Sequence, residues 1–142
     1  MSRLALAILG LLATTPAFAQ TAEQFIGRWG FVSYWNEEDR AKSITGARAE
    51  CGHPYIIARG PKGGPMMHGA DAAAPSELEI LQANGKAYLV TPDDNNAITS
   101  LTTREIVFFD ANTFITRYVV EQAHSRYGMM VYARCGAAPA RR

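Results

Sequence analysis

The stretch Thr21–Trp35, with the sequence TAEQFIGRWGFVSYW, carries the most specific pattern of the chain. Thr21 and the Gln24 that follows three residues later match a capping box, which predicts a short helical turn at the start of the stretch. Gly27 accepts positive φ and is typical of a residue that ends such a turn. Aromatic and smaller residues then alternate over 28–35, which predicts a first β-strand.

Short β-type runs separated by turn signals continue through the rest of the chain. Asn84-Gly85 is the clearest hairpin signal, because both residues accept the positive φ of a type I′ turn. Strands at hairpin spacing predict an all-β fold, and we expect an antiparallel up-and-down barrel of about eight strands after the short N-terminal helical turn. A β-sandwich is the alternative. The runs lie at 28–35, 54–59, 77–83, 86–91, 103–109, 113–121 and 126–135, with a possible short strand at 66–69 and doubtful runs near 43–47 and 97–101.

Alternation along the strands assigns side chains to the two faces of the sheet. In the first run, Trp29 and Trp35 share the bulkier face, which we expect to point into the barrel. Trp29 lies at the start of the strand and is expected to fill the core, whereas Trp35 lies nearer the other rim. The pattern predicts strands with one buried and one solvated face. Further expected core residues are Phe31, Phe108, Phe114, Tyr118 and Tyr132.

The N-terminal segment has the pattern of a cleavable secretory signal. Arg3 precedes an apolar run of about ten residues, which is too short to span a bilayer as a helix. Ala17-Phe18-Ala19 places small residues before the expected cleavage site, and an uncleaved membrane anchor is the alternative. We therefore predict a signal peptide over 1–19, one domain over 20–136, a flexible tail over 137–142, and a periplasmic or secreted protein that does not span the membrane.

The charged residues of the chain are balanced and scattered. The sequence contains 14 Lys and Arg and 13 Asp and Glu, and without Arg3 of the expected signal the two signs are equal. A neutral chain without a basic patch gives no electrostatic basis for binding nucleic acid or an anionic membrane surface. We therefore expect the partner to be a small apolar ligand or another protein.

Two cysteines, Cys51 and Cys135, remain after the expected signal. Paired thiols in an oxidising compartment tend to form disulfides, and two cysteines allow one intramolecular pair. A catalytic thiol and a metal ligand are the alternatives. Neither Cys lies in a C-x-x-C motif, and Cys51 with His53 alone makes a weak metal signal. The compartment therefore favours a Cys51–Cys135 disulfide.

Gly27 and Trp29, after a short helical turn, form a Gly-x-Trp motif that resembles the opening of the lipocalin/calycin superfamily. In that superfamily the Trp plugs the barrel floor, and an Arg near the end of the last strand packs over it. Arg134 matches this Arg in type and in order along the chain, and a guanidinium over an indole is a favourable cation–π contact. The resemblance implies a small bacterial exported β-barrel that binds a ligand without catalysing a reaction.

The remaining polar residues form no recognisable metal or catalytic motif. His53, His68 and His124 do not have the spacing of a metal site on a helix or strand. Met66, Met67 and His68 have side chains suited to copper, but Met also fills gaps at flexible apolar surfaces. We therefore expect loop packing or contact with an apolar ligand there, no metal, no cofactor, and a protein that is not an enzyme.

We predict that a small apolar or amphipathic ligand binds at the barrel rim opposite Trp29, lined by the loops over 35–40 and 61–68. The alternative is a protein-interaction module, or an inhibitor of a protease or other enzyme of the small exported barrel type. A ligand binder requires an internal cavity, whereas an interaction module requires a filled barrel with an exposed apolar patch. The expected ligand-binding residues are Trp35, Met66, Met67, Tyr118 and Tyr132.

Overall fold

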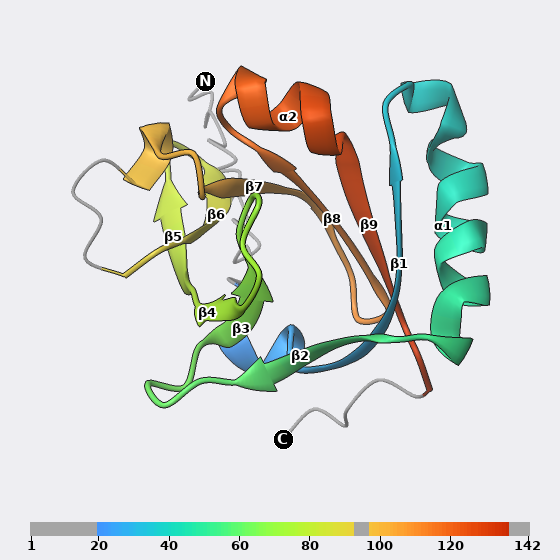
Figure 1. The fold of residues 1–142 in the computed structure, drawn as a ribbon, viewed down its shortest axis with the longest axis horizontal. Helices are drawn as coiled ribbons and strands as arrows, with labels where there is room; N and C mark the ends of the chain where they lie inside the picture. Colours follow the sequence, from blue (N-terminus) through green and yellow to red (C-terminus); the bar gives the residue numbers. More distant parts are fainter. Residues whose placement is uncertain (1–19, 93–96, 137–142) are drawn as a thin grey trace, which may run out of the picture.

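The computed structural model describes residues 20–92 and 97–136, and within these ranges the chain forms nine strands, two helices and four short 3-10 turns (Figure 1). The expected signal peptide, 1–19, and the expected tail, 137–142, lie outside the described residues. The strands are β1 (Gly27–Tyr34), β2 (Tyr55–Arg59), β3 (Pro65–His68), β4 (Pro75–Glu77), β5 (Glu79–Ala83), β6 (Lys86–Val90), β7 (Arg104–Phe109), β8 (Thr113–Tyr118) and β9 (Met129–Arg134). The helices are α1 (Arg40–Ala49) and α2 (Glu121–Tyr127), and the 3-10 turns are η1 (Ala22–Gln24), η2 (Glu37–Asp39), η3 (Glu50–Gly52) and η4 (Ala97–Thr99).

The nine strands of the described chain form one sheet in the order β4-β3-β2-β1-β9-β8-β7-β6-β5, and neighbouring strands are antiparallel. The outermost strands, β4 and β5, are separated in the chain only by Leu78, whose N–H donates to Pro65 O at 2.9 Å. The sheet therefore curls into a nearly closed up-and-down barrel (Figure 1). This confirms the predicted all-β barrel. The strand count exceeds eight because the chain bends at Leu78, pairing with β3 before the bend and with β6 after it.

Two local predictions are confirmed in the backbone. At the start of the fold, η1 forms the expected helical turn, and the backbone N–H of Thr21 donates to Gln24 Oε1 at 2.8 Å. Between β5 and β6 the chain turns at Asn84 and Gly85, whose φ angles are +53° and +73°. Both angles lie in the left-handed region that a type I′ turn requires.

The two helices lie where the sequence analysis predicted other structure. α1 replaces the doubtful strand near 43–47 and begins within the segment 35–40, which was expected to be a loop. α2 shortens two expected strand runs, 113–121 and 126–135, to β8 and β9, and η4 replaces the doubtful strand near 97–101. Short helices draw most of their stability from tertiary packing rather than from local propensity. None of the helices in the described residues has the length and apolar character that crossing a membrane requires.

α1 packs against the outer face of β1 and β9 (Figure 1). Gly30 of β1 permits this approach, because a Cβ at this position would lie 1.7 Å from Ala47 O of the helix. A second apolar layer fills the space between helix and sheet, and Ile115 and Val131 are fully buried in it. The expectation of a solvated outer face is therefore wrong under α1. Phe108, expected in the barrel core, packs in this outer layer instead.

The barrel interior holds a larger apolar cluster around Trp29. The rings of Trp29, Phe25 and Phe114 are fully buried, and the Phe114 centroid lies 4.7 Å from Trp29 and 5.0 Å from Phe25. Both pairs meet edge to face, an arrangement that adds to the stabilisation from burial. Tyr118 and Tyr132 also belong to this cluster, as predicted.

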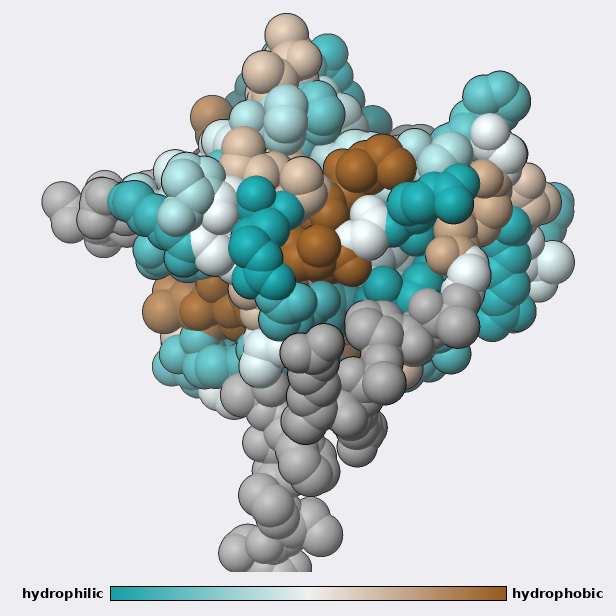
Figure 2. Space-filling view, turned by 90° about the horizontal axis from the view of Figure 1, so that it is seen from below, coloured by the Kyte–Doolittle hydropathy of each residue, from teal (hydrophilic) through white to brown (hydrophobic). Residues whose placement is uncertain are grey.

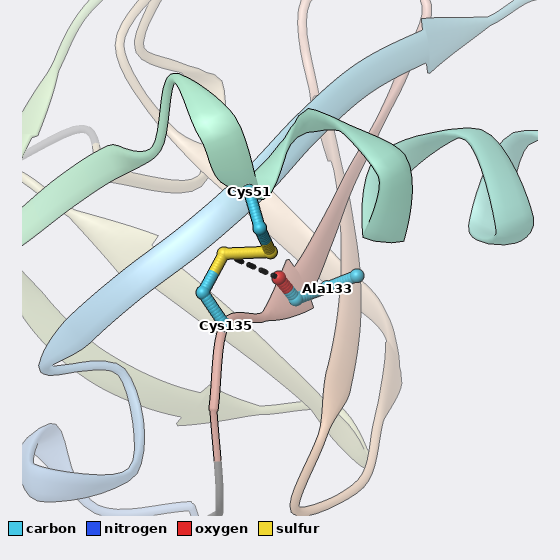
Figure 3. The surroundings of a disulfide bond; sticks show 3 residues. All are labelled: Cys51, Ala133 and Cys135. Carbon is cyan, nitrogen blue, oxygen red and sulfur yellow. Dashed lines mark hydrogen bonds between the residues drawn. A yellow bond between two sulfur atoms is a disulfide. The ribbon is translucent and has the colours of Figure 1, made fainter.

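The predicted disulfide joins Cys51 to Cys135 (Figure 3). Cys51 lies in η3, directly after α1, and Cys135 directly follows β9, so the bond ties the outer helix to the last strand. The dashed line in Figure 3 joins Cys135 Sγ to Ala133 O at 3.9 Å. A disulfide sulfur carries no proton to donate, so this is a packing contact.

Candidate functional site

The closed end of the barrel, called the floor below, is built from Trp29, Arg134 and η1. The indole N–H of the fully buried Trp29 donates to Phe25 O at 2.8 Å. The Arg134 guanidinium carbon lies 4.1 Å from the centroid of the Trp29 ring, which confirms the predicted stacking. Each guanidinium nitrogen of Arg134 also donates to a backbone carbonyl, namely Ala111 O at 3.0 Å, Ile26 O at 3.2 Å and Gln24 O at 2.7 Å.

Gly27 completes the floor at a position where a side chain would be strained. Its φ is +139°, and a Cβ there would lie 3.0 Å from Arg134 Nη1. Both conditions favour glycine. The three motif residues Gly27, Trp29 and Arg134 therefore form one packed unit, in which the Trp29 indole and each guanidinium nitrogen of Arg134 donate to a backbone carbonyl. The floor is thus a structural element.

The hairpin between β2 and β3 lies at the floor end of the barrel. Ile57 of β2 pairs with Gly27 at the start of β1, so β2 runs toward the floor. At the end of β2, Arg59 forms an ion pair with Glu23 of η1. The expectation that 61–68 lines an entrance opposite the floor is therefore wrong for the first half of this segment.

The end opposite the floor is crossed by α2 (Figure 1). Ala123 of α2 packs into the inner core, and Asp71 in the loop between β3 and β4 holds the helix in place. The Asp71 carboxylate accepts hydrogen bonds from the Tyr127 hydroxyl at 2.6 Å and from Arg126 Nη1 at 2.7 Å. The rim at which the sequence analysis placed the ligand entrance therefore carries a helix.

A partly exposed aromatic surface lies on the inner face of β1 instead. β1 pairs with β2 only over Gly27–Trp29, so within the described chain the rest of that edge has no partner strand. Phe31 shares the inner face with its partner Tyr132, a residue of the inner core, yet Phe31 is 38% exposed. Trp35 directly follows β1, donates its indole N–H to Ser125 O of α2 at 3.0 Å and is 59% exposed, so it lies at the rim next to this surface. The expectation that Phe31 fills the core is therefore wrong, since its side chain is partly exposed.

Tyr55 and His68 extend this surface beyond β1. The Tyr55 ring centroid lies 5.9 Å from Phe31 and 5.8 Å from His68. The Tyr55 hydroxyl accepts the backbone N–H of His68 at 2.9 Å and lies 3.1 Å from His68 Nδ1. His68 is exposed, whereas Ser33 and Tyr55 are half-buried. We call the following side chains the inner-face patch: Phe31, Ser33 and Tyr55 of the inner face, with the adjoining Trp35 and His68.

Behind the inner-face patch, Arg104 at the start of β7 places its guanidinium in the barrel interior. Arg104 is 1% exposed. Its Nη1 donates to the Tyr132 hydroxyl at 3.5 Å and its Nη2 donates to His68 O, and the guanidinium carbon lies 5.1 Å from the Tyr118 ring centroid. Arg104 Nε is buried and has no hydrogen-bond partner among the described residues.

The charge of Arg104 has no carboxylate partner in the described part of the chain, where the ion pairs use other basic side chains. Burial raises the pKa of both Tyr118 and Tyr132, although the nearby Arg104 acts to lower them. Both phenols are therefore neutral near neutral pH. Among the described residues, the buried charge of Arg104 is thus offset only by neutral dipoles and an aromatic ring.

The five predicted ligand-binding residues do not converge on one site. Tyr118 and Tyr132 border Arg104, and Trp35 belongs to the inner-face patch. Met67 is fully buried in the inner core, and Met66 alternates to the other face of β3. No group of three or more His, Cys, Asp or Glu side chains in residues 20–92 and 97–136 is placed to hold a metal ion.

Sequence reasoning missed Arg104 as a site residue because Arg104 belongs to no sequence motif, and the irregularity in β7 misplaced Phe108 rather than Arg104. The register between β7 and β8 shifts between Ile106 and Phe108, as in a β-bulge. Strict alternation from Phe108, which was expected inside, would also place Arg104 inside, and the shift instead turns Phe108 outward. A bulge of this kind leaves no reliable signal in a single sequence.

The arrangement offers a ligand an aromatic surface, hydroxyl and imidazole groups beside it, and a buried cation behind it. Comparisons of the chain with protein-family models, with curated proteins and with solved structures find no match.

Proposed function

We propose that the protein is a non-enzymatic binding protein that takes a small amphipathic ligand at the inner-face patch. The observation that carries the proposal is the 38% exposure of Phe31 on an inward-facing position of β1. Its ring lies 5.9 Å from Tyr55 and 5.0 Å from Tyr132. Accessible aromatic surface with a few polar groups beside it is the composition of small-molecule sites.

The direction of access follows from the same geometry. The floor is sealed by Trp29 and Arg134, and the opposite end is crossed by α2. The ligand therefore enters through the barrel wall, where β1 has no partner strand beyond Trp29 in the described chain. Its apolar part packs on Phe31, and its polar part reaches the Tyr55 hydroxyl.

The proposal includes an exported protein of lipocalin-like type. The pattern of residues 1–19 is that of a signal peptide. The Cys51–Cys135 disulfide is compatible with an oxidising compartment. The stacking of Arg134 on Trp29 is the feature that the lipocalin/calycin resemblance implies. These features support a periplasmic or secreted location.

Tryptophan fluorescence tests the proposed site, because Trp29 is buried in the floor whereas Trp35 lies in the inner-face patch. Titration with dodecanol, a neutral amphiphile, is expected to shift the emission to shorter wavelength as Trp35 loses contact with water. Phe31→Ala should weaken dodecanol binding by about ten-fold, since it removes apolar contact area.

Ile56→Ala is the matched control, because Ile56 is a similarly exposed apolar side chain, at 55%, on the outer face of β2. This variant should bind dodecanol like the wild type. An unchanged emission spectrum of the wild type up to the solubility limit of dodecanol would refute the proposal. An equal loss of affinity in both variants would place the site elsewhere.

A protein-interaction module, including an inhibitor, is the second candidate, and exposed apolar side chains outside the inner-face patch favour it. The surface seen from the floor end carries a central apolar area within mainly hydrophilic surroundings (Figure 2). Ile56 and Leu101 are 55% and 53% exposed. Ile56→Asp should abolish binding of such a partner, measured by co-elution in gel filtration, and should leave dodecanol binding unchanged.

A further inference from the structure

Arg104 is a buried cation with an incomplete set of partners in the described chain. Nε lacks an acceptor, the contact of Nη1 with the Tyr132 hydroxyl is long at 3.5 Å, and the acceptor of Nη2 is the neutral His68 carbonyl. Burial of a charged group without an opposite charge is unfavourable. The site is therefore one that an anion stabilises.

The missing charge is a single negative one. Tyr118 and Tyr132 are neutral near neutral pH, so the guanidinium is the one charged group of this cluster. A monoanion balances it, whereas a dianion would bring a second buried charge without a partner. A planar guanidinium with a free N–H also matches the two oxygens of a carboxylate.

Two residues connect Arg104 to the exposed surface. The Tyr132 ring lies 5.0 Å from the partly exposed Phe31, and its hydroxyl is the acceptor of Arg104 Nη1. His68 is exposed at its side chain and accepts from Arg104 Nη2 at its carbonyl oxygen. A ligand that enters over Phe31 and displaces the long Tyr132 contact brings its head group to the guanidinium.

We propose that Arg104 binds the head group of the ligand, and that the ligand is an amphipathic carboxylate. This inference rests on the proposed function, in which the inner-face patch binds an amphipathic molecule. The apolar tail lies on Phe31 and Tyr55, and the carboxylate accepts hydrogen bonds from Arg104 and from the Tyr132 hydroxyl.

A comparison of head groups on one tail tests the inference. Dodecanoate and dodecyltrimethylammonium are titrated below their critical micelle concentrations, and dodecanol is titrated below its solubility limit. Binding is followed by Trp35 emission and by calorimetry. Dodecanoate should bind about ten-fold or more tightly than dodecanol, because it gains charge-assisted hydrogen bonds to Arg104. Dodecyltrimethylammonium should bind more weakly than dodecanol, because its charge repels the guanidinium.

Arg104→Met should remove this preference, so that dodecanoate and dodecanol bind alike. Arg117→Met is the matched control, because Arg117 is an arginine of the adjacent strand β8 that is half-exposed and paired with Glu105. It should retain the preference for dodecanoate. Circular dichroism verifies the fold of each variant. If Arg104→Met does not fold, the inference is judged by whether the wild type binds dodecanoate more tightly than dodecanol.

The outcomes separate the inference from the proposed function. If neither dodecanoate nor dodecanol binds, the proposed function fails and the inference fails with it. If both bind with equal affinity, the proposed function stands and the role of Arg104 is refuted. A preference for dodecanoate that persists in Arg104→Met also refutes that role, because another group must then bind the carboxylate.

Discussion

Arg134 and Arg104 both place a guanidinium against an aromatic ring inside the barrel. They differ in how many of their guanidinium nitrogens have a hydrogen-bond acceptor within the protein. Arg134 stacks on Trp29, and each of its three nitrogens donates to a backbone carbonyl. Arg104 lies farther from its ring, at 5.1 Å from Tyr118, and leaves Nε without a partner in the described chain. Arg104 is also the more deeply buried of the two.

The difference teaches where the fold is complete without a ligand. At the floor, the cost of removing a cation from water is offset by carbonyl acceptors and an indole. Beside the inner-face patch the same cost is only partly offset. The floor therefore stabilises the fold, whereas the region around Arg104 has hydrogen-bonding capacity that the described residues do not use. The two regions should respond differently to perturbation.

Reduction of the disulfide should give the largest loss of stability. The disulfide belongs to the floor region, because Cys135 directly follows Arg134. The bond joins residues 84 positions apart. A cross-link over a loop of this length lowers the conformational entropy of the unfolded chain, which raises the free energy of unfolding by about 4–5 kcal/mol. Urea denaturation with and without reductant measures the loss, with thiol labelling to verify reduction. A Cys51→Ala/Cys135→Ala double variant should match the reduced protein. An unchanged midpoint in fully reduced protein would contradict the prediction.

Trp29→Ala should destabilise the protein by about 3–5 kcal/mol, because it leaves a large cavity in the inner core. Trp29 is fully buried, and its loss also removes the ring beneath Arg134. Chemical denaturation measures the change in the free energy of unfolding. Trp35→Ala is the comparison from the inner-face patch, where a 59% exposed ring should contribute less than about 1 kcal/mol. Equal losses in the two variants would show that the patch is as structural as the floor.

Arg134→Met should cost about 2–3 kcal/mol, because it removes the cation–π contact and leaves three carbonyls without their donor. Arg117→Met removes an arginine of similar exposure from a surface ion pair with Glu105 and should change stability by less than about 1 kcal/mol. The same urea series measures both. If Arg134→Met is no worse than Arg117→Met, the floor contacts do not stabilise the fold.

The floor could be predicted from the sequence because its signals are local or depend on the chain ends. The capping box at Thr21, the glycine at 27 and the alternation that buries Trp29 all lie within one short stretch. Asn84-Gly85 fixed one hairpin in the same way, through the positive φ that both residues adopt. The disulfide followed from there being two cysteines in a chain with a signal-like start.

The region around Arg104 could not be predicted because it depends on tertiary structure. α1 carries few apolar residues, and it forms where Gly30 lets it approach the sheet. α2 follows β8 directly and crosses the rim where an entrance was expected. The register shift between Ile106 and Phe108 turns Phe108 to the outer layer. Arginine is rarely buried without a charged partner, and no sequence motif marks Arg104, although it lies inside.

Arg104→Met should give the smallest effect on the stability of the ligand-free protein. The sign of the change in the free energy of unfolding should also differ from that of Arg134→Met. Replacing a buried, incompletely paired charge by an apolar side chain of similar length is often neutral or stabilising. We expect a change between zero and a gain of about 2 kcal/mol, where Arg134→Met gives a loss. Chemical denaturation without added amphiphile measures it. A loss above about 2 kcal/mol would make Arg104 a structural group like Arg134.

Addition of dodecanoate should then stabilise the wild type more than it stabilises Arg104→Met. A ligand that binds only the folded state stabilises it by about 2.7 kcal/mol at a hundred times its dissociation constant. At a concentration that saturates the wild type, the variant gains less because it binds the carboxylate about ten-fold more weakly. The wild type should therefore gain about 1.4 kcal/mol more stability than the variant on addition of dodecanoate. If the two gain equally, the hydrogen-bonding capacity at Arg104 is not used by a carboxylate, and the contrast between the two arginines concerns stability alone.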